Sequence, residues 1–267
     1  MNVSGKMKEG WQDVSAAIEA CAEEPTEKAV HQVRTRCRRL EALISAVVSI
    51  RLNAERLHST GEALLRKIKK IRRAAGPVRD LDIHLSLLET IAGDPPDEDA
   101  QELKKTLERQ RKRASVAALK DIERHRPELE RRAARFLDAF NDLSVNAQEL
   151  DTAVLAKARF LETAAAFSLI RADNLHDFRK QSKQARYIAE INPRSAASAR
   201  LAKKLNCVQD AIGAWHDWDV MMEEAGEILG RTRAPLLRRI QANRSKAYRV
   251  ALRIARQTQR EALRDGS

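Results

Sequence analysis

The sequence is poor in residues that break helices or favour strands. Among 267 residues it has 9 glycines and 7 prolines, and only 4% of its residues are aromatic. Alanine, leucine, arginine, glutamate and lysine, which lose little rotamer freedom in a helix, are abundant. The composition therefore predicts an all-α fold, and an apolar content of 43% is enough for a sizeable core.

Cysteines and long apolar runs are also scarce. The three cysteines, Cys21, Cys37 and Cys207, are odd in number and lack metal-ligand spacing, so neither a disulfide framework nor a zinc site is predicted. The longest apolar run, Ala42 to Ile50, is too short to span a bilayer. We expect a soluble protein of the reducing cytoplasm, with no membrane partner, metal or cofactor.

Positive charge is what the sequence has in excess. Its 50 Lys and Arg outnumber its 38 Asp and Glu, which gives a formal net charge of +12. Such a field attracts anions without selecting among nucleic acid, acidic membrane and phosphate chains. The run Arg66–Arg73 is one basic concentration, and its Lys67 and Lys70 are candidate anion ligands. Arg and Lys without interleaved exposed aromatics favour phosphate groups over stacked bases.

The clearest organisational signal is an internal repeat. Gly76–Ile83 (GPVRDLDI) matches Gly213–Val220 (GAWHDWDV) in the glycine, both aspartates and the apolar positions. Upstream, Val30–Arg34 (VHQVR) matches Leu175–Arg179 (LHDFR). The same two elements in the same order predict a duplication, that is, two pseudo-symmetric antiparallel helical bundles around a basic central groove.

Helix breakers suggest where these bundles begin and end. Gly76-Pro77, Gly213 and Gly230 each close or open an amphipathic run, and together with the other breakers they predict about ten helices. The segment Asn141–Asp151 has no strong apolar period. It predicts a boundary between an N-terminal half, residues 11–143, and a C-terminal half, residues 151–267.

The first copy of the repeat carries a basic stripe. On a helix with about 100° per residue, His31, Arg34 and Arg38 fall within about 60° of one another. Apolar residues such as Val33 and Cys37 fall on the opposite face and are expected to pack into the core. A stripe of this kind is commonly a solvated face.

The second copy repeats the stripe. His176, Arg179, Lys183 and Arg186 lie together, opposite the apolar Phe178. A solvated face does not need a histidine at the start of the stripe in both halves. The repetition therefore favours an anion site, with both stripes facing one shared groove.

The paired aspartates raise an enzymatic alternative. Residues two apart on a helix point about 160° away from each other, so Asp80 and Asp82 are not expected to converge on one substrate atom. Asp82 and Asp219 border apolar stripes and are predicted to be partly buried acceptors that orient Arg or His side chains.

Three classes of function remain open from the residues alone. A polyanion-binding module without catalysis is favoured, and a helical nucleic-acid-binding protein is the first alternative. A metal-dependent phosphohydrolase is the second, because His176 and His216-Asp217 are similar to the ligands of all-helical enzymes of that kind. It is disfavoured because the first copy has Arg79 where the second has His216.

The sequence resembles the CHAD family, the conserved histidine α-helical domain, in four segments that occur in the family's order: AVHQVRTRCRRLEAL, GPVRDLDIHLSLL, NLHDFRKQSKQARYIAEI and LNCVQDAIGAWHDWDVMMEEA. The resemblance implies two helical bundles around a basic central channel. It also implies binding of inorganic polyphosphate, or of related phosphate-rich polyanions, often at polyphosphate granules. No stretch is similar to the catalytic β-barrel domain that is often fused to CHAD, so no enzymatic activity is expected.

The resemblance also implies which residues bind the polyanion. The histidines of the CHAD family correspond to His31 and His176. Its basic positions correspond to Arg34, Arg38, Arg39, Arg79, Arg179, Lys183 and Arg186. The sequence departs from the family at Glu41, where the first motif often has another Arg. This carboxylate either weakens that side of the site or pairs with a neighbouring cation.

Overall fold

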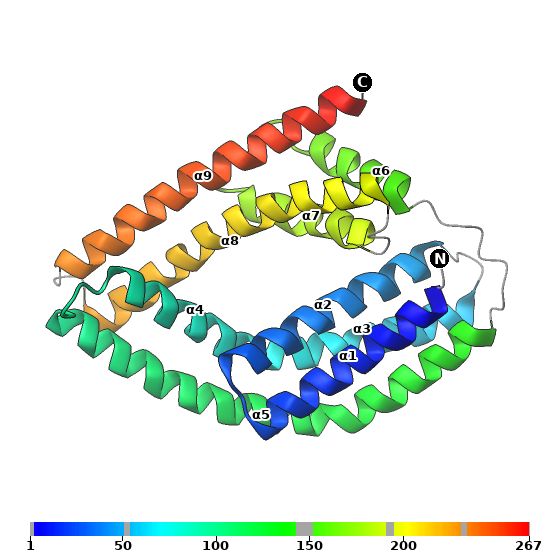
Figure 1. Cartoon of the computed structure of the whole chain (residues 1–267), viewed down its shortest axis with the longest axis horizontal. Coiled ribbons are helices and arrows are strands. Elements are labelled where there is room, and N and C mark those ends of the chain that lie inside the picture. Colours follow the sequence, from blue (N-terminus) through cyan, green and yellow to red (C-terminus); the bar gives the residue numbers. More distant parts are fainter. Residues whose placement is uncertain (1–2, 51–53, 143–151, 191–194, 231–233, 267) are drawn as a thin grey trace. The chain divides into compact units, whose positions relative to one another are not determined.

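The computed structural model describes residues 3–50, 54–142, 152–190, 195–230 and 234–266. Within these ranges the chain forms nine α-helices and no strand (Figure 1). Their bounds are α1 Val3–Glu23, α2 Glu27–Ile50, α3 Glu55–Ala74, α4 Gly76–Ile91, α5 Glu98–Asp142, α6 Thr152–Ala166, α7 Leu175–Glu190, α8 Ala196–Leu229 and α9 Ala234–Gly266. The all-α prediction is confirmed. None of these helices is both long and apolar enough to cross a membrane.

The helix break predicted at Gly213 is wrong, because α8 runs through this residue. At the matching position of the first copy, α3 ends at Ala74 and α4 begins at Gly76. The difference lies in the following residue. Pro77 has no backbone N–H and restricts the residue before it, whereas Ala214 keeps its N–H and allows the helix to continue. Gly230, by contrast, ends α8 with a φ of 71°, as expected for a glycine after a helix.

The chain divides into two compact units. One contains Met1–Asp82 and Arg109–Leu150, and the other contains Ile83–Glu108 and Asp151–Ser267. The segment Ile83–Glu108, which belongs to the N-terminal half by sequence, therefore groups with the second unit, because the divisions fall inside α4 and α5. The predicted repeat boundary at 141–151 lies almost entirely outside the described residues and stays a prediction.

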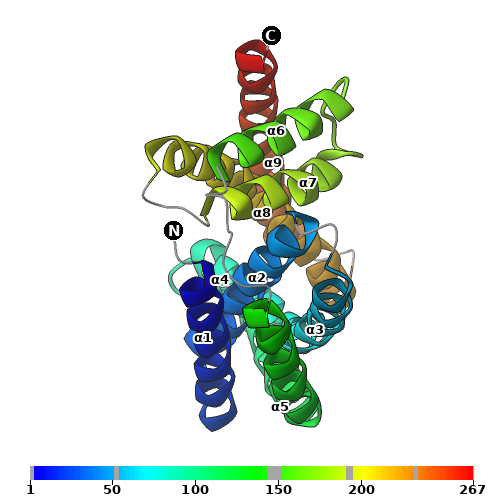
Figure 2. The same cartoon turned by 90° about the vertical axis from the view of Figure 1, so that its right-hand side faces the viewer.

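In the first unit, α1, α2, α3 and the later part of α5 lie side by side (Figures 1 and 2). The predicted core face of α2 is confirmed, since Val33 and Cys37 are fully buried. Gly61 of α3 allows a close approach. A Cβ at this position would lie 2.7 Å from Val48 Cγ2 and 3.3 Å from Phe136 Cε2. Burial of each large apolar side chain contributes about 1.5–3 kcal/mol.

In the second unit, α6, α7, α8 and α9 contribute to a hydrophobic core that includes two phenylalanines. Phe178, on the predicted apolar face of α7, is fully buried, and its ring centroid lies 5.5 Å from that of Phe167 and 6.3 Å from that of Phe160. Edge and tilted ring contacts of this kind add about 0.5–1.5 kcal/mol beyond the buried area. The burial of Phe178 fixes the rotation of α7 and leaves its basic stripe on the other side.

The three thiols differ in exposure and should differ in reactivity. Burial raises the pKa of the Cys21 thiol, and burial followed by the Glu41 carboxylate raises the pKa of Cys37 to about 12. Cys207 is exposed. Because the thiolate is the nucleophile, we expect an aromatic disulfide reagent to modify only Cys207 rapidly in the native protein. Equal rates for all three thiols would contradict the fold; unfolding in guanidinium should make them equal.

Candidate anion-binding site

The first basic cluster gathers side chains from neighbouring helices of the first unit. α2 supplies His31, Arg34 and Arg38, and the first turn of α4 supplies Arg79. The Arg34 side chain is only 16% exposed, with its Nη2 3.7 Å from Asp80 Oδ1. Arg79 Nη1 donates a 2.7 Å hydrogen bond to Glu27 Oε1. These carboxylates hold the guanidinium groups in place at the edge of the helix pair.

Positive charge is crowded in this cluster. Burial, followed by the nearby Arg38, lowers the pKa of Arg34 to about 10, although Asp80 acts in the opposite direction. Partial burial and then Arg79 and Arg38 lower the pKa of His31. A lowered pKa in a cation means that its charged form is disfavoured by its surroundings. A bound anion would relieve this repulsion.

Glu41 pairs with a cation, which decides between the two alternatives for this residue. Arg72 Nε of α3 donates to both Glu41 oxygens, at 3.0 and 3.2 Å. Burial raises the pKa of Glu41, while Arg72 opposes that shift. Arg72 was not singled out from the sequence, because it lies in a continuous basic run whose periodicity does not identify the neighbouring helix.

The second basic cluster is built in the second unit. The His176 ring of α7 lies 5.6 Å from the His216 ring of α8, centroid to centroid. Arg179 Nε donates to the Gln209 carbonyl at 3.3 Å, and Gln209 Nε2 donates back to the Arg179 carbonyl at 2.8 Å. Partial burial, followed by His216 and Arg179, lowers the pKa of His176. This cluster therefore has the same electrostatic character as the first.

The rest of the second stripe continues along α7. Lys183 is half-buried one turn beyond Arg179. Arg186 Nη1 donates a 2.6 Å hydrogen bond to Asn206 Oδ1, and its guanidinium carbon lies 4.5 Å from the centre of the Tyr187 ring. In the repeat register that places Arg38 opposite Lys183, Arg186 corresponds to Glu41. The second copy thus has a cation where the first has a carboxylate.

One close contact recurs in both copies. A Cβ added to Gly76 would lie 2.9 Å from Arg34 Nη1, and a Cβ added to Gly213 would lie 3.0 Å from Arg179 Nη2. The glycine shared by the two repeat segments is therefore where the stripe arginine lies directly over the backbone of the adjacent helix. This explains why Gly213 is present in the middle of α8, although glycine costs about 1 kcal/mol relative to alanine there.

The two aspartates predicted to orient cations each accept from an arginine of the next long helix. Asp82 is 5% exposed and accepts from Arg111 Nε of α5 at 2.5 Å. Asp219 accepts from Arg244 Nε of α9 at 2.6 Å. Asp80, two residues before Asp82, instead lies near Arg34, so the two carboxylates serve different partners.

Three of the predicted ligands lie apart from these clusters. Lys67 and Lys70 are on the side of α3 that faces α5, where their charges act on His125. Arg39 is exposed and points about 100° away from Arg38 around the axis of α2. It is not among the described cations that lower the pKa of His31 or of Arg34. Whether the two stripes face one shared groove stays a prediction, as does the pseudo-symmetry of the two bundles.

The metal alternative depends on His176 and His216. Their rings are close, but the described residues contain no group of three or more His, Cys, Asp or Glu side chains arranged to hold a metal ion. The chemistry that the described side chains offer at both clusters is hydrogen-bond donation from guanidinium, ammonium and imidazole groups, which suits an anion.

Comparison with known proteins identifies the family and the fold. Residues 8–226 match the CHAD domain, and the chain belongs to that family. The fold is similar to that of a crystal structure of the CHAD domain from the plant Ricinus communis, with a TM-score of 0.67 and 19% sequence identity, over 97% of this chain and 88% of that one. No curated protein sequence matches the chain.

The contact between Arg179 and Gly213 predicts an unusual mutational pattern. Gly226→Ala, in the same helix with open space around it, should stabilise the protein by about 0.5–1 kcal/mol through helix propensity. Gly213→Ala should stabilise the protein by about 0.5–1.5 kcal/mol less than Gly226→Ala does, because the new methyl group displaces Arg179 from the Gln209 carbonyl. The measurement is the free energy of unfolding in urea.

A double-mutant cycle isolates the contact. In an Arg179→Ala background the two glycine replacements should stabilise the protein equally, because no guanidinium remains to be displaced. A difference that persists in this background would show that Gly213 is required for another reason.

Proposed function

We propose that this CHAD domain binds inorganic polyphosphate, without catalysis of its own, through the His31 and His176 clusters. The observation that carries the proposal is the enclosure of Arg34, 16% exposed, beside Arg38 and Arg79. Like charges held together at the cost of desolvation are unfavourable in the free protein. A chain of phosphates adds counter-charge at several points, beyond that of Asp80 and Glu27.

Phosphate groups fit the clusters better than nucleic-acid bases do. Arginine binds phosphate oxygens bidentately, whereas binding to single-stranded nucleic acid depends largely on stacking of bases on exposed aromatic rings. The large apolar side chains that are exposed in the described part of the chain are aliphatic: Val116, Val154, Leu169 and Leu263. The ordinary ligand of the CHAD family points the same way. Association with cytoplasmic polyphosphate granules follows from such a ligand.

A salt-titrated competition tests the choice of ligand. Long-chain polyphosphate should displace single-stranded DNA of equal charge at every salt concentration. Log affinity should fall linearly with log salt, by about 0.7 for each phosphate neutralised if polyphosphate behaves like a single strand. Tighter binding of DNA than of polyphosphate throughout the titration would contradict the proposal and identify nucleic acid as the ligand.

The role of the second cluster is tested in the same titration. Arg179→Ala should weaken polyphosphate binding and reduce the salt slope by about 0.7, because one phosphate contact is lost. Arg200→Ala is the matched control, since it removes the same charge from an exposed position on α8 outside the stripe. Equal effects of the two substitutions would mean that only net charge matters and that the stripe is not a site.

The histidines should make binding depend on pH. Their pKa values are lowered in the free protein from an ordinary value of 6.5, so the unfolded chain takes up protons first as pH falls. Stability of the free protein should therefore decrease as pH falls below about 6.5.

A bound phosphate chain favours the charged imidazoles, so binding should take up protons and strengthen from about pH 8 to about pH 6.

Substitution by glutamine separates charge from hydrogen bonding. The double variant His31→Gln with His176→Gln should lose most of the pH dependence of affinity and keep binding at pH 8, because glutamine still donates a hydrogen bond. His31 Nε2 lies 3.3 Å from Thr35 Oγ1, which is the contact a purely structural histidine would use. If the pH dependence is unchanged in the double variant, and also after His216→Gln is added, the imidazoles are structural.

A further inference from the structure

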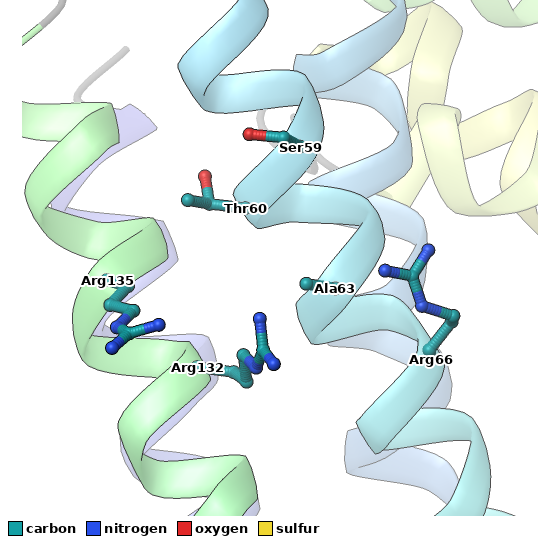
Figure 3. Close-up of a pocket in the computed structure, with 6 residues that line it drawn as sticks. All are labelled: Ser59, Thr60, Ala63, Arg66, Arg132 and Arg135. Carbon is teal, nitrogen blue, oxygen red and sulfur yellow. The ribbon is translucent and has the colours of Figure 1, made fainter.

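Apart from the two basic clusters, a cationic groove lies in the first unit, between α3 and α5 (Figure 3). Its first section encloses about 290 Å³ and is lined by Ser59, Thr60, Ala63, Arg66, Arg132 and Arg135. Its second section encloses about 130 Å³ and adds Lys67 and Lys70. Both sections share Ala63, Arg66 and Arg132, so they are adjacent, and together they are called the α3/α5 groove.

This groove is separate from the His31 cluster. Around α3, Lys67 is about 140° from Arg72, the residue that pairs with Glu41 of α2. The charges that act on Lys67 come from Lys70, Arg131 and Arg132, none of which belongs to the His31 cluster. One face of α3 thus directs Lys67 into the α3/α5 groove, and the opposite face directs Arg72 towards Glu41 of α2.

Small side chains keep the groove open. Ala63 is buried at its base, and Figure 3 shows Thr60 of α3 and Arg132 of α5 pointing into the space between the two helices. The Ser59 and Thr60 hydroxyls donate to the Arg56 carbonyl at 3.1 and 2.7 Å. Their protons are therefore engaged, and the donors available to a ligand are those of the lysines and arginines.

Cations outnumber carboxylates along the groove. None of the described residues that line it is acidic. Glu128 of α5 accepts from both Arg131 and Arg132, and Glu62 lies 3.6 Å from Arg66. Partial burial, followed by Lys70, Arg132 and Arg131, lowers the pKa of Lys67. Positive charge here is only partly compensated by the protein itself.

We propose that the α3/α5 groove is a second, independent binding site for a run of phosphate groups. Ser59 and Lys70 are eleven residues apart on α3, so the groove follows the helix for about 16 Å. An extended polyanion places charge along this whole length, whereas a single phosphate leaves most of the cations uncompensated. The inference rests on the proposed function in its choice of ligand, but its residues are different.

Two sites on one chain have a consequence for ligand length. Once a polyphosphate molecule occupies one site, its remaining length raises the effective concentration of phosphate at the other. Long chains should therefore bind more tightly per molecule than fragments that fill one site, beyond the statistical effect of having more phosphates.

Lysine acetylation followed by mass spectrometry tests the groove directly. Lys67 and Lys70 report on the groove, and Lys180 and Lys183 report on the His176 cluster. At a polyphosphate concentration about ten times the dissociation constant, mass action predicts about tenfold slower acetylation of both pairs. The exposed Lys112 and Lys120 of α5 line neither section of the groove and should be much less protected.

Each outcome decides between the two sites. Protection of Lys180 and Lys183 alone overturns the groove and leaves the proposed function standing. Protection of Lys67 and Lys70 alone overturns the His176 cluster as the site and supports the groove. Uniform protection of every lysine, controls included, or of none, overturns the groove.

A variant provides the second measurement. Arg132→Gln with Arg135→Gln changes two side chains at the surface of α5, so helicity by circular dichroism should be unchanged. In this variant protection of Lys67 and Lys70 should fall several-fold, while Lys180 and Lys183 stay protected. Unchanged protection of Lys67 and Lys70 in a folded variant would show that the two arginines do not contact the ligand and would overturn the proposal.

Discussion

The placement of both basic clusters depends on one contact, in which an arginine side chain lies against a glycine of a neighbouring helix segment. Arg34 over Gly76 and Arg179 over Gly213 bring a guanidinium group against the backbone of the helix that carries the second repeat element, so close that a Cβ at either glycine would have to displace the guanidinium group. Each contact couples the basic stripe of one helix to the second repeat element.

Partly burying several cations side by side is electrostatically unfavourable, and the two copies of the repeat use different partners to offset this. In the first, Glu41 on the stripe helix pairs with Arg72 across the helix interface. In the second, Arg186 occupies the position of Glu41, donates to Asn206 and lies 3.5 Å from the Glu190 carboxylate on its own helix. Buried charges are tolerated only where such partners satisfy them, and the remaining excess is what an anion would neutralise.

The two copies also show how a repeat can diverge in backbone without losing its contacts. Pro77 separates α3 from α4, whereas Ala214 lets α8 continue as one helix of 34 residues. The aspartates near the ends of both repeat segments nevertheless accept from the next long helix, Asp82 from Arg111 and Asp219 from Arg244. Conserved contacts therefore do not require conserved helix boundaries.

The sequence by itself determined the all-α character of the chain, the buried faces of α2 and α7 and the composition of the two stripes. Periodicity fixes the direction of a side chain around its own helix axis, which is why the burial of Val33 and Phe178 was predictable. Only the tertiary structure decided which helix covers each remaining face. It paired Glu41 with Arg72, 31 residues away, and turned Lys67 towards α5 instead of α2. Such partners are distant in sequence, and no local pattern encodes the packing that brings them together.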